Sequence, residues 1–242
     1  MGRLITRLAA DDGWDCIEVD AQLQPDVDRA LADLLPRAHL AVDFSSPQGT
    51  RVLLEHLQKH PLPCVVGTTG LDAAHHEALA ALARHAPVAC ATNFSLGMNL
   101  LWVLAEKAAA FLPPDLFDAE ILEAHHRRKK DAPSGSARTL AQHVQAGRTA
   151  AGFPAGETAF HDSASGPRRA NDIGMAVVRG GDVVGEHTVL FLGSGERLEL
   201  THRVTDRAIF ARGAWMAALH LQGKPPGLYP VRELLGLNAL LS

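Results

Sequence analysis

The amino-acid sequence predicts an α/β protein with two domains, and three observations support this. Short apolar runs alternate with helical patterns through the first half of the chain, which is typical of parallel strands joined by helices. After Pro113-Pro114 the pattern changes to a strand, a helix and then three strands separated by glycine-rich turns. The length of 242 residues, 47% of them hydrophobic, suits one large domain or two small ones.

The first half predicts an open sheet of parallel strands. We expect strands at residues 16–19, 39–42, 63–66 and 87–91, and helices at residues 27–35, 48–58, 71–85 and 97–112. A parallel pair needs a long crossover connection, and the intervening helices supply one each time. Polar or small residues follow the strands and end them.

The second half predicts an α+β domain. We expect a strand at 118–123, a helix at 136–146, a loop rich in Gly, Pro and Ser at 147–171, strands at 174–179, 186–192 and 196–203, and a last helix at 207–221. Glycine-rich turns at 180–182 and 193–195 predict antiparallel hairpins. We therefore place one domain at residues 1–95, to which the C-terminal region 206–242 returns, and the other at residues 96–205.

Composition excludes several classes of protein. The net charge of −4 gives no support to nucleic-acid binding, which needs a strongly basic face. No apolar run approaches the roughly 18 residues of a membrane span, and Asp11-Asp12 interrupt any signal-peptide core. Cys16, Cys64 and Cys90 form no Cys-x-x-Cys pair, which favours reduced cysteines in a cytoplasmic protein.

Three predicted strands end in segments that suit a cofactor crevice. These segments are Asp43-Phe44-Ser45, Gly67-Thr68-Thr69-Gly70 and Ala91-Thr92-Asn93-Phe94-Ser95. Ligands of open parallel sheets bind outside the carboxyl ends of the strands, where small residues allow a close backbone approach. The alternative is that such residues only terminate strands and cap helices. For one segment the two interpretations are equal, but three at the same edge favour a crevice.

Asp20 ends the predicted strand at 16–19. An acidic residue at this position commonly binds the adenosine ribose hydroxyls of a dinucleotide and repels a 2′-phosphate. The following Ala21-Gln22-Leu23 supplies no cation for such a phosphate. An ordinary turn aspartate is an equally good explanation of Asp20 taken alone.

The stretch from Glu123 to Ser136 concentrates groups that could handle a small carboxylate. Its Pro133-Ser134-Gly135-Ser136 turn leads into a helix, and the free N–H groups of a helix N-terminus bind anions. Lys129 and His126 add positive charge, and His125 can donate a proton near neutral pH.

Other interpretations of this stretch are possible. Arg127, Arg128 and Lys130 suit a solvated charged face. A metal site made of Glu123 and the adjacent histidines is disfavoured, because side chains of neighbouring strand residues point to opposite faces. We expect no metal.

Several motifs occur in one order along the chain. They are Val42-Asp43-Phe44-Ser45, Gly67-Thr68-Thr69-Gly70, Asn93-Phe94-Ser95-Leu96-Gly97-Met98-Asn99, Glu123-x-His125-His126-x-x-Lys129-x-Asp131-Ala132-Pro133-Ser134-Gly135-Ser136, Arg179-Gly180-Gly181-Asp182-Val183-Val184-Gly185-Glu186-His187-Thr188 and Glu199-Leu200-Thr201-His202. Together they resemble the dihydrodipicolinate reductase family, now usually called 4-hydroxy-tetrahydrodipicolinate reductases. The resemblance covers nearly the whole chain, and its His-His-x-x-Lys-x-Asp-Ala-Pro-Ser-Gly run is highly specific.

The resemblance implies a function and a set of partners. It implies a Rossmann-like dinucleotide-binding domain followed by a substrate-binding and oligomerisation domain. The implied oxidoreductase reduces a cyclic unsaturated imine dicarboxylate, 4-hydroxy-tetrahydrodipicolinate, to tetrahydrodipicolinate with NADH or NADPH. This step lies on the route to diaminopimelate and lysine. Members of the family are usually homotetramers assembled through the sheets of the second domain.

The resemblance also implies roles for individual residues. His125 and Lys129 are the implied proton-transfer residues. The implied substrate contacts are His126, Ser134, Gly135 and Ser136, the last of which is more often Thr in the family. The implied cofactor contacts are Gly67, Thr68, Thr69, Ala91, Thr92, Asn93 and Phe94. We add Gly2, at the end of the glycine-rich turn, and Asp20, at the end of the predicted strand, as candidate cofactor contacts from their places in the chain.

One departure from the family lies at the N-terminus. The family opens with a strand and a glycine-rich turn that holds the pyrophosphate, whereas this chain begins with Met1-Gly2-Arg3-Leu4-Ile5, which resembles the end of that turn and the start of the first helix. We expect a start codon upstream of Met1 that would add an apolar strand and glycines. The alternative is a non-enzymatic remnant of the fold that cannot hold the cofactor.

Overall fold

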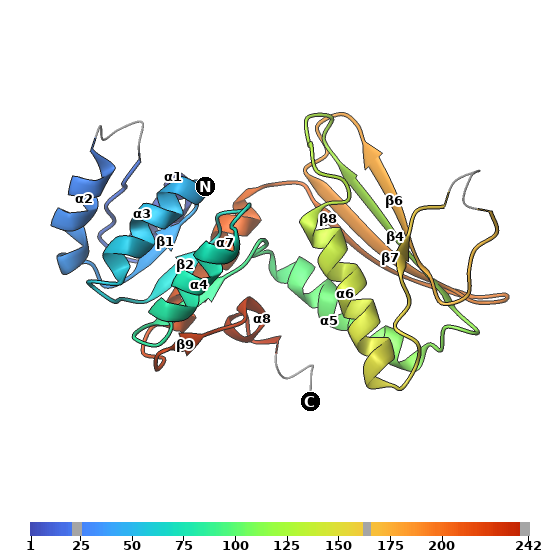
Figure 1. Cartoon of the computed structure of the whole chain (residues 1–242). Helices are drawn as coiled ribbons and strands as arrows, with labels where there is room; N and C mark the ends of the chain where they lie inside the picture. Colours follow the sequence, from blue (N-terminus) through green and yellow to red (C-terminus); the bar gives the residue numbers. More distant parts are fainter. Residues whose placement is uncertain (21–25, 162–165, 238–242) are drawn as a thin grey trace. The chain divides into compact units, whose positions relative to one another are not determined.

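The computed structural model describes residues 1–20, 26–161 and 166–237, and the chain divides into two compact units (Figure 1). The first unit contains Met1–Leu96 and the segment that begins at Ala208, and the second contains Gly97–Arg207. The first unit has a parallel sheet and the second a mixed sheet, which confirms the predicted α/β class.

The first unit is a parallel sheet flanked by helices. Its elements are α1 (Gly2–Asp11), α2 (Val27–Leu34), η1 (Leu35–Arg37), β1 (Ala41–Asp43), α3 (Pro47–Leu57), β2 (Cys64–Val66), α4 (Ala73–Leu82), β3 (Pro87–Cys90), α7 (Ala208–Leu221), β9 (Gly227–Leu228) and α8 (Val231–Leu234). The strand order is β1-β2-β3-β9, and each neighbouring pair is parallel. Every predicted helix of the first half, and the predicted C-terminal helix, is present within a few residues of its expected bounds.

Capping residues define where the helices of this unit begin. The side chains of Asp26, Ser46 and Asp72 accept hydrogen bonds from the backbone N–H groups three residues later, which would otherwise lack partners. Behind these caps, α3 and α4 bury apolar faces against the sheet. The shared core contains Leu54, Leu57, Cys64, Val66, Leu79, Leu82 and Val88.

The prediction of a strand at residues 16–19 is wrong. Residues 14–20 have no regular secondary structure, and Ile17 is 65% exposed. β1 is an edge strand, and no strand of the described residues pairs with its outer side or with residues 16–19. An extended segment without a neighbour leaves its N–H and C=O groups unpaired, so β-propensity alone does not make it a strand.

The second unit packs two helices on one face of a five-stranded sheet (Figure 1). Its elements are α5 (Leu96–Phe111), β4 (Asp118–His125), α6 (Gly135–Ala150), β5 (Thr158–Ala159), β6 (Ile173–Arg179), β7 (Gly185–Leu192) and β8 (Arg197–Val204). The strand order is β5-β6-β4-β7-β8, with β4 parallel to β6 and antiparallel to β7.

The strand order corrects one of the two predicted hairpins. β7 and β8 form the expected antiparallel hairpin, but β6 and β7 are not neighbours, because β4 lies between them. β4 buries Ala119 and Ile121 against the helices. It is the central strand of the sheet, so strands pair with it on both sides. The predicted loop at 147–171 is also shorter, since α6 continues to Ala150 and β5 pairs with β6.

The core of the second unit lies between the sheet and its helices. Ile121, Val189 and Phe191 of the sheet pack with Leu140 and Val144 of α6. α5 and α6 approach each other so closely at Gly147 that a Cβ atom there would lie 2.0 Å from the Glu106 carbonyl oxygen. A glycine inside a helix is unfavourable by itself, and here the close helix contact requires it.

Among the helices of the described residues, none combines the length and apolar character that a bilayer span requires.

Candidate active site

The carboxyl ends of β1 and β2 in the first unit are held together by the buried side chain of Asp43. Its carboxylate accepts hydrogen bonds from the hydroxyl groups of Ser45 (2.5 Å), Thr50 and Thr68 (3.0 Å). The Asp43 carbonyl oxygen also accepts the N–H of Gly67 at 2.8 Å. One aspartate therefore fixes the two turns that follow adjacent parallel strands, where a ligand crevice is expected.

Gly67 lies directly under an aromatic ring. A Cβ atom at this position would approach the Phe44 ring to 2.2 Å, so only glycine fits. The Phe44 ring packs in turn on Phe94, with ring centroids 5.6 Å apart. The Phe44 ring, which contacts Phe94, therefore packs directly against the backbone of the Gly67 turn.

The predicted cofactor residues differ in their accessibility. The side chains of Thr69 and Thr92 are exposed, and Gly67, Ala91 and Asn93 are half-buried. Thr68 is buried and bonded to Asp43, and Phe94 is 1% exposed. A ligand at this edge would therefore meet the backbone rather than the ring of Phe94.

Asp20 and Gly2 are exposed in the first unit. Gly2 begins α1, as expected for the start of the first helix. Asp20 follows an irregular segment instead of ending a strand, which corrects the position assigned to it. Residues 21–23, which were expected to offer no cation to a phosphate, lie outside the described residues.

In the second unit, several polar side chains converge where β4 ends. Glu123 and His125 are two residues apart on β4 and share the face that the helices cover. The sheet register places Arg179 of β6 beside His125 and His187 of β7 beside Glu123. Glu123, His125 and His187 are each less than 10% exposed.

The carboxylate of Glu123 is surrounded by hydrogen-bond donors. One oxygen accepts the Ser134 N–H (3.0 Å) and an Arg179 N–H (2.8 Å); the other accepts a second Arg179 N–H (3.0 Å) and hydrogen-bonds His125 Nδ1. Burial alone would raise the pKa of Glu123, but the bonds from His125, Arg179 and Ser134 outweigh it and lower this pKa to about 2. Glu123 is therefore an anion at neutral pH.

Ser134 of the Pro-Ser-Gly-Ser turn contacts this cluster and is the N-cap of α6. Its hydroxyl accepts the Ala137 N–H (3.2 Å) as the helix cap and lies 3.1 Å from His187 Nε2. A Cβ atom at Gly135 would meet no other atom within 4 Å, so the first turn of α6 is open. The sequence-predicted anion site therefore has an accessible helix N-terminus.

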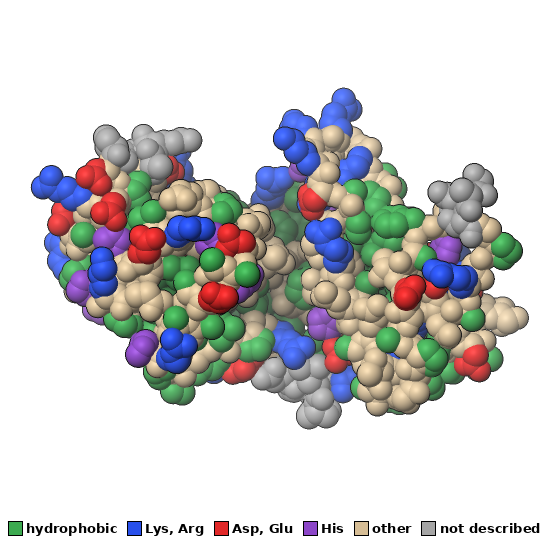
Figure 2. Space-filling model, in the orientation of Figure 1, with side chains coloured by type: hydrophobic (Ala, Val, Ile, Leu, Met, Phe, Trp, Pro, Cys, Tyr) green, Lys and Arg blue, Asp and Glu red, His purple; other side chains and the backbone are tan. Residues whose placement is uncertain are grey.

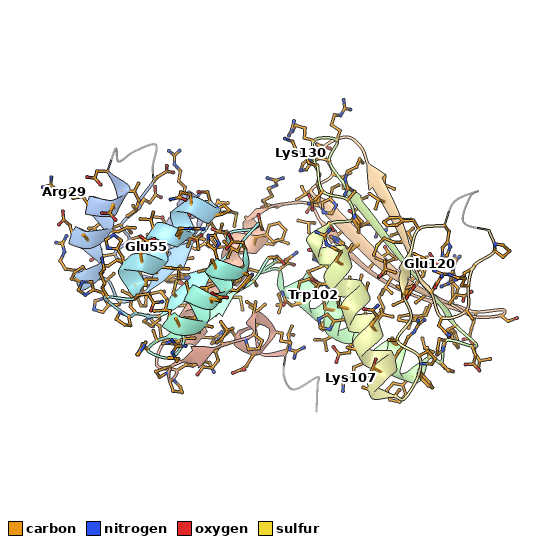
Figure 3. All side chains as sticks on the ribbon, in the orientation of Figure 1. Arg29, Glu55, Trp102, Lys107, Glu120 and Lys130 are labelled. Atoms are coloured by element: carbon orange, nitrogen blue, oxygen red, sulfur yellow. The ribbon has the colours of Figure 1, made fainter. Side chains whose placement is uncertain are left out.

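Positive charge gathers around the loop between β4 and α6 (Figure 2). Lys129 is partly buried and forms an ion pair with Asp131 at 2.9 Å, whereas Lys130 is exposed at the tip of the loop (Figure 3). His126 Nε2 lies 3.4 Å from an Arg207 nitrogen. Burial and then the cations Arg207 and Arg128 lower the pKa of His126, which favours its neutral form.

His187 packs against His125 with ring centroids 5.1 Å apart. Burial and then the neighbouring His125 lower the pKa of His187 to about 4, so its ring is neutral near pH 7. A neutral His187 can accept a hydrogen bond from the Ser134 hydroxyl while that oxygen accepts the Ala137 N–H. The ring thereby supports the turn at the start of α6.

Glu123, His125 and His187 bring ligand atoms within 4.8 Å of one another, which is close enough to hold a metal ion. The Arg179 guanidinium occupies both carboxylate oxygens of Glu123. A metal ion would have to displace the Arg179 guanidinium or lie beside it, and two cations repel each other. The Glu123–His125–His187 cluster therefore suits proton transfer better than metal binding.

Sequence reasoning missed Arg179, His187, Arg207 and Gly185 as site residues. All four lie far along the chain from His125. The sheet register brings Arg179 and His187 to β4. Arg207 reaches His126 through its side chain, and Gly185 lies against the His125 ring. Glu123 was considered only as a metal ligand, although its spacing of two residues from His125 on a strand was a usable signal for a shared face.

Models of two domain families match nearly all of the chain. The first, described as "Dihydrodipicolinate reductase, N-terminus", matches residues 6–94, and the second, "Dihydrodipicolinate reductase, C-terminus", matches residues 97–235.

Curated relatives match most of the chain. A 4-hydroxy-tetrahydrodipicolinate reductase of Thiobacillus denitrificans is 48% identical over 204 residues, covering 84% of this chain and 76% of the relative. One from Brucella abortus is 46% identical over 202 residues, covering 84% of this chain and 75% of the relative.

Two solved structures share the fold. A dipicolinate-bound dihydrodipicolinate reductase from Paenisporosarcina sp. TG-14 has a TM-score of 0.66 and 26% identity, covering 84% of this chain and 76% of that one. An amine dehydrogenase from Mycobacterium smegmatis has a TM-score of 0.58 and 12% identity, covering 96% and 92%; this similarity concerns the fold alone.

Proposed function

The chain belongs to the dihydrodipicolinate reductase family, and from this we propose that it reduces 4-hydroxy-tetrahydrodipicolinate to tetrahydrodipicolinate with NADH or NADPH. The observation that carries the proposal is the buried Glu123–His125 pair beside the open N-terminus of α6. This arrangement combines an acid–base group with an anion site, as reduction of a dicarboxylate requires.

The substrate carboxylates would bind in the second unit. The N–H groups of Gly135 and Ser136 lie in the first turn of α6, where the helix dipole favours negative charge. His126 and Arg207 lie side by side and supply further donors for a carboxylate. A related solved structure is named as binding dipicolinate, a planar dicarboxylate, which supports this class of ligand.

Proton transfer would fall to His125, as donor or acceptor, and to Lys129, as donor. Loss of the 4-hydroxyl group of the substrate as water leaves a conjugated imine, and the nicotinamide cofactor, when bound, supplies the hydride for its reduction. The electron density that develops on the substrate needs a proton, and a nearby cation stabilises it until the proton arrives. His125 is oriented by Glu123, and Lys129 carries the positive charge in the same loop.

The first unit has residues that suit the dinucleotide. The Gly67 turn follows β2 and packs under the Phe44 ring, and Asp43 fixes the turn around Thr68. Thr69, Ala91, Thr92, Asn93 and the Phe94 backbone would contact the nicotinamide half, while Gly2 and Asp20 would contact the pyrophosphate and ribose. The first unit is accordingly the proposed dinucleotide-binding domain, and the second the proposed substrate domain.

We expect the enzyme to favour NADH or to use both cofactors. Asp20 is exposed and offers its carboxylate to ribose hydroxyls, and the same charge would repel a 2′-phosphate. The measurement is kcat/KM for NADH and NADPH side by side. A strong preference for NADPH would show that Asp20 is only a turn residue. Asp20→Asn should raise the relative efficiency with NADPH if the assignment is right.

We propose a homotetramer assembled through the outer face of the second sheet. Leu122 and Val178 lie on the face opposite Glu123 and are 40% and 57% exposed. Val178→Asp should dissociate the tetramer, since it would bury a charge in an apolar contact. Sedimentation velocity tests this, with Ile17→Asp, at a residue 65% exposed in the first unit, as the matched control. A monomeric wild type, or a tetrameric V178D, would contradict the proposed assembly.

Equilibrium binding of NADH tests the proposed function against the alternative of a non-enzymatic remnant. Calorimetric titration of the full chain with NADH should give a saturable, one-to-one isotherm. A folded chain that binds neither NADH nor NADPH would instead support the remnant. Asp43→Asn should weaken the binding, because the Asp43 carboxylate holds the Gly67 turn together.

A further inference from the structure

The Glu123 carboxylate imposes one hydrogen-bonding pattern on His125. An ionised carboxylate only accepts hydrogen bonds, so the Nδ1 atom that faces it must carry the proton. In the neutral ring, Nε2 is then the unprotonated nitrogen and can exchange a proton with a ligand. A Cβ atom at position 185 would lie 3.1 Å from this Nε2, so Gly185 lets the ring pack close to the start of β7.

Arg179 links this pair to the loop that carries Lys129. Its guanidinium donates to both oxygens of Glu123, at 3.0 and 2.8 Å, and also to the Asp131 carbonyl oxygen at 2.7 Å. The Asp131 side chain holds Lys129 at 2.9 Å. A single side chain from β6 therefore contacts both the carboxylate that orients His125 and the segment that orients Lys129.

We propose that Glu123 and Arg179 are positioning residues of this site: Glu123 fixes the tautomer of His125, and Arg179 balances the charge of Glu123 and ties the Lys129 loop to it. The inference rests on the proposed function, because it assigns proton transfer to His125. A buried carboxylate without a paired cation would be costly, and the two-pronged contact of Arg179 both compensates and aligns it.

Glu123→Gln provides the sharpest test. If the amide oxygen replaces the oxygen that accepts from Ser134 and Arg179, the NH₂ group faces His125 Nδ1 and also the second Arg179 N–H, which then loses its acceptor. His125 must now accept at Nδ1 and carry its proton on Nε2. The substitution therefore reverses the tautomer while nearly preserving side-chain volume.

The readout is ¹⁵N NMR of imidazole-labelled protein, with His125 assigned by its loss in a His125→Asn variant. We expect neutral His125 to be protonated on Nδ1 in the wild type and on Nε2 in E123Q. We also expect kcat to fall by about 10-fold or more, with a smaller change in KM, as when the carboxylate that orients a histidine is removed. An unchanged tautomer in a folded E123Q would overturn the inference.

Glu106→Gln is the matched control. Glu106 hydrogen-bonds Nδ1 of His143 at 2.6 Å in the same unit, between α5 and α6 rather than at the site. It should leave the His125 tautomer and kcat unchanged. If E123Q does not fold, Arg179→Lys keeps the positive charge but cannot serve Glu123 and Asp131 together. An unchanged kcat in R179K would overturn the role of Arg179.

The two levels of the proposal can fail separately. A reversed tautomer in E123Q with an unchanged kcat would support the positioning of His125 but remove His125 from proton transfer. A wild-type protein with no reductase activity, but with an Nδ1-protonated His125 that reverses in E123Q, would retain the positioning and contradict the proposed reaction.

Discussion

Lys129→Ala is expected to lower kcat by roughly 10²-fold or more, the loss typical of removing a placed proton donor. Lys129 is partly buried in the loop after β4, and its ammonium group is held by Asp131 close to the start of α6. The positive charge of Lys129 would stabilise the electron density that develops on the substrate during reduction. Loss of this charge should therefore affect the chemical step more than substrate binding. Steady-state kinetics with saturating cofactor measures both kcat and KM.

Lys130→Ala is the control for this prediction. Lys130 is the next residue and is exposed, so its removal changes the local charge equally without altering the buried groups. K130A should keep a nearly normal kcat. If K129A keeps its turnover and only raises KM, Lys129 binds a carboxylate and does not take part in the chemistry.

His125→Asn is expected to lower kcat by about 10² to 10⁴-fold, the usual contribution of a general acid or base. Asparagine is polar and can still bond to Glu123, but its amide cannot exchange a proton with the substrate. The chemical step should therefore slow in H125N, whereas the open α6 N-terminus should continue to bind the substrate, so KM should change less than kcat.

His143→Asn is the matched control for His125. His143 also bonds a carboxylate through Nδ1, but it lies on α6 and stacks on Trp102, away from the cluster at the end of β4. Its replacement should leave kcat nearly unchanged. An H125N enzyme with wild-type turnover would exclude His125 from proton transfer.

The sequence predicted local elements well and sheet neighbours poorly. The sequence of α3, α4, α5 and α7 shows apolar periodicity and clear ends, so these helices could be predicted from local sequence alone. The strand at 16–19 failed because strand formation needs a partner, and the β6–β7 hairpin failed because β4 pairs between them. Both errors concern which segments lie side by side, and a local pattern does not encode this.

In the candidate site, too, the residues close together in sequence could be predicted and those brought in from distant strands could not. His125, Lys129 and the Ser134–Ser136 turn lie in one short stretch, so their chemistry and spacing could be interpreted directly. Arg179 and His187 reach Glu123 only through the parallel and antiparallel registers of β4. The role of Glu123 follows from those partners, and composition alone could not separate a metal ligand from a positioning carboxylate.

Oxidation of NADH on addition of 4-hydroxy-tetrahydrodipicolinate tests the central claim most directly. The full chain should oxidise NADH only when this substrate is present, with tetrahydrodipicolinate formed in equal amount, and K129A should lose at least about 10²-fold of that rate. A folded protein that binds NADH but shows no substrate-dependent oxidation of NADH or NADPH would contradict the proposed reductase activity.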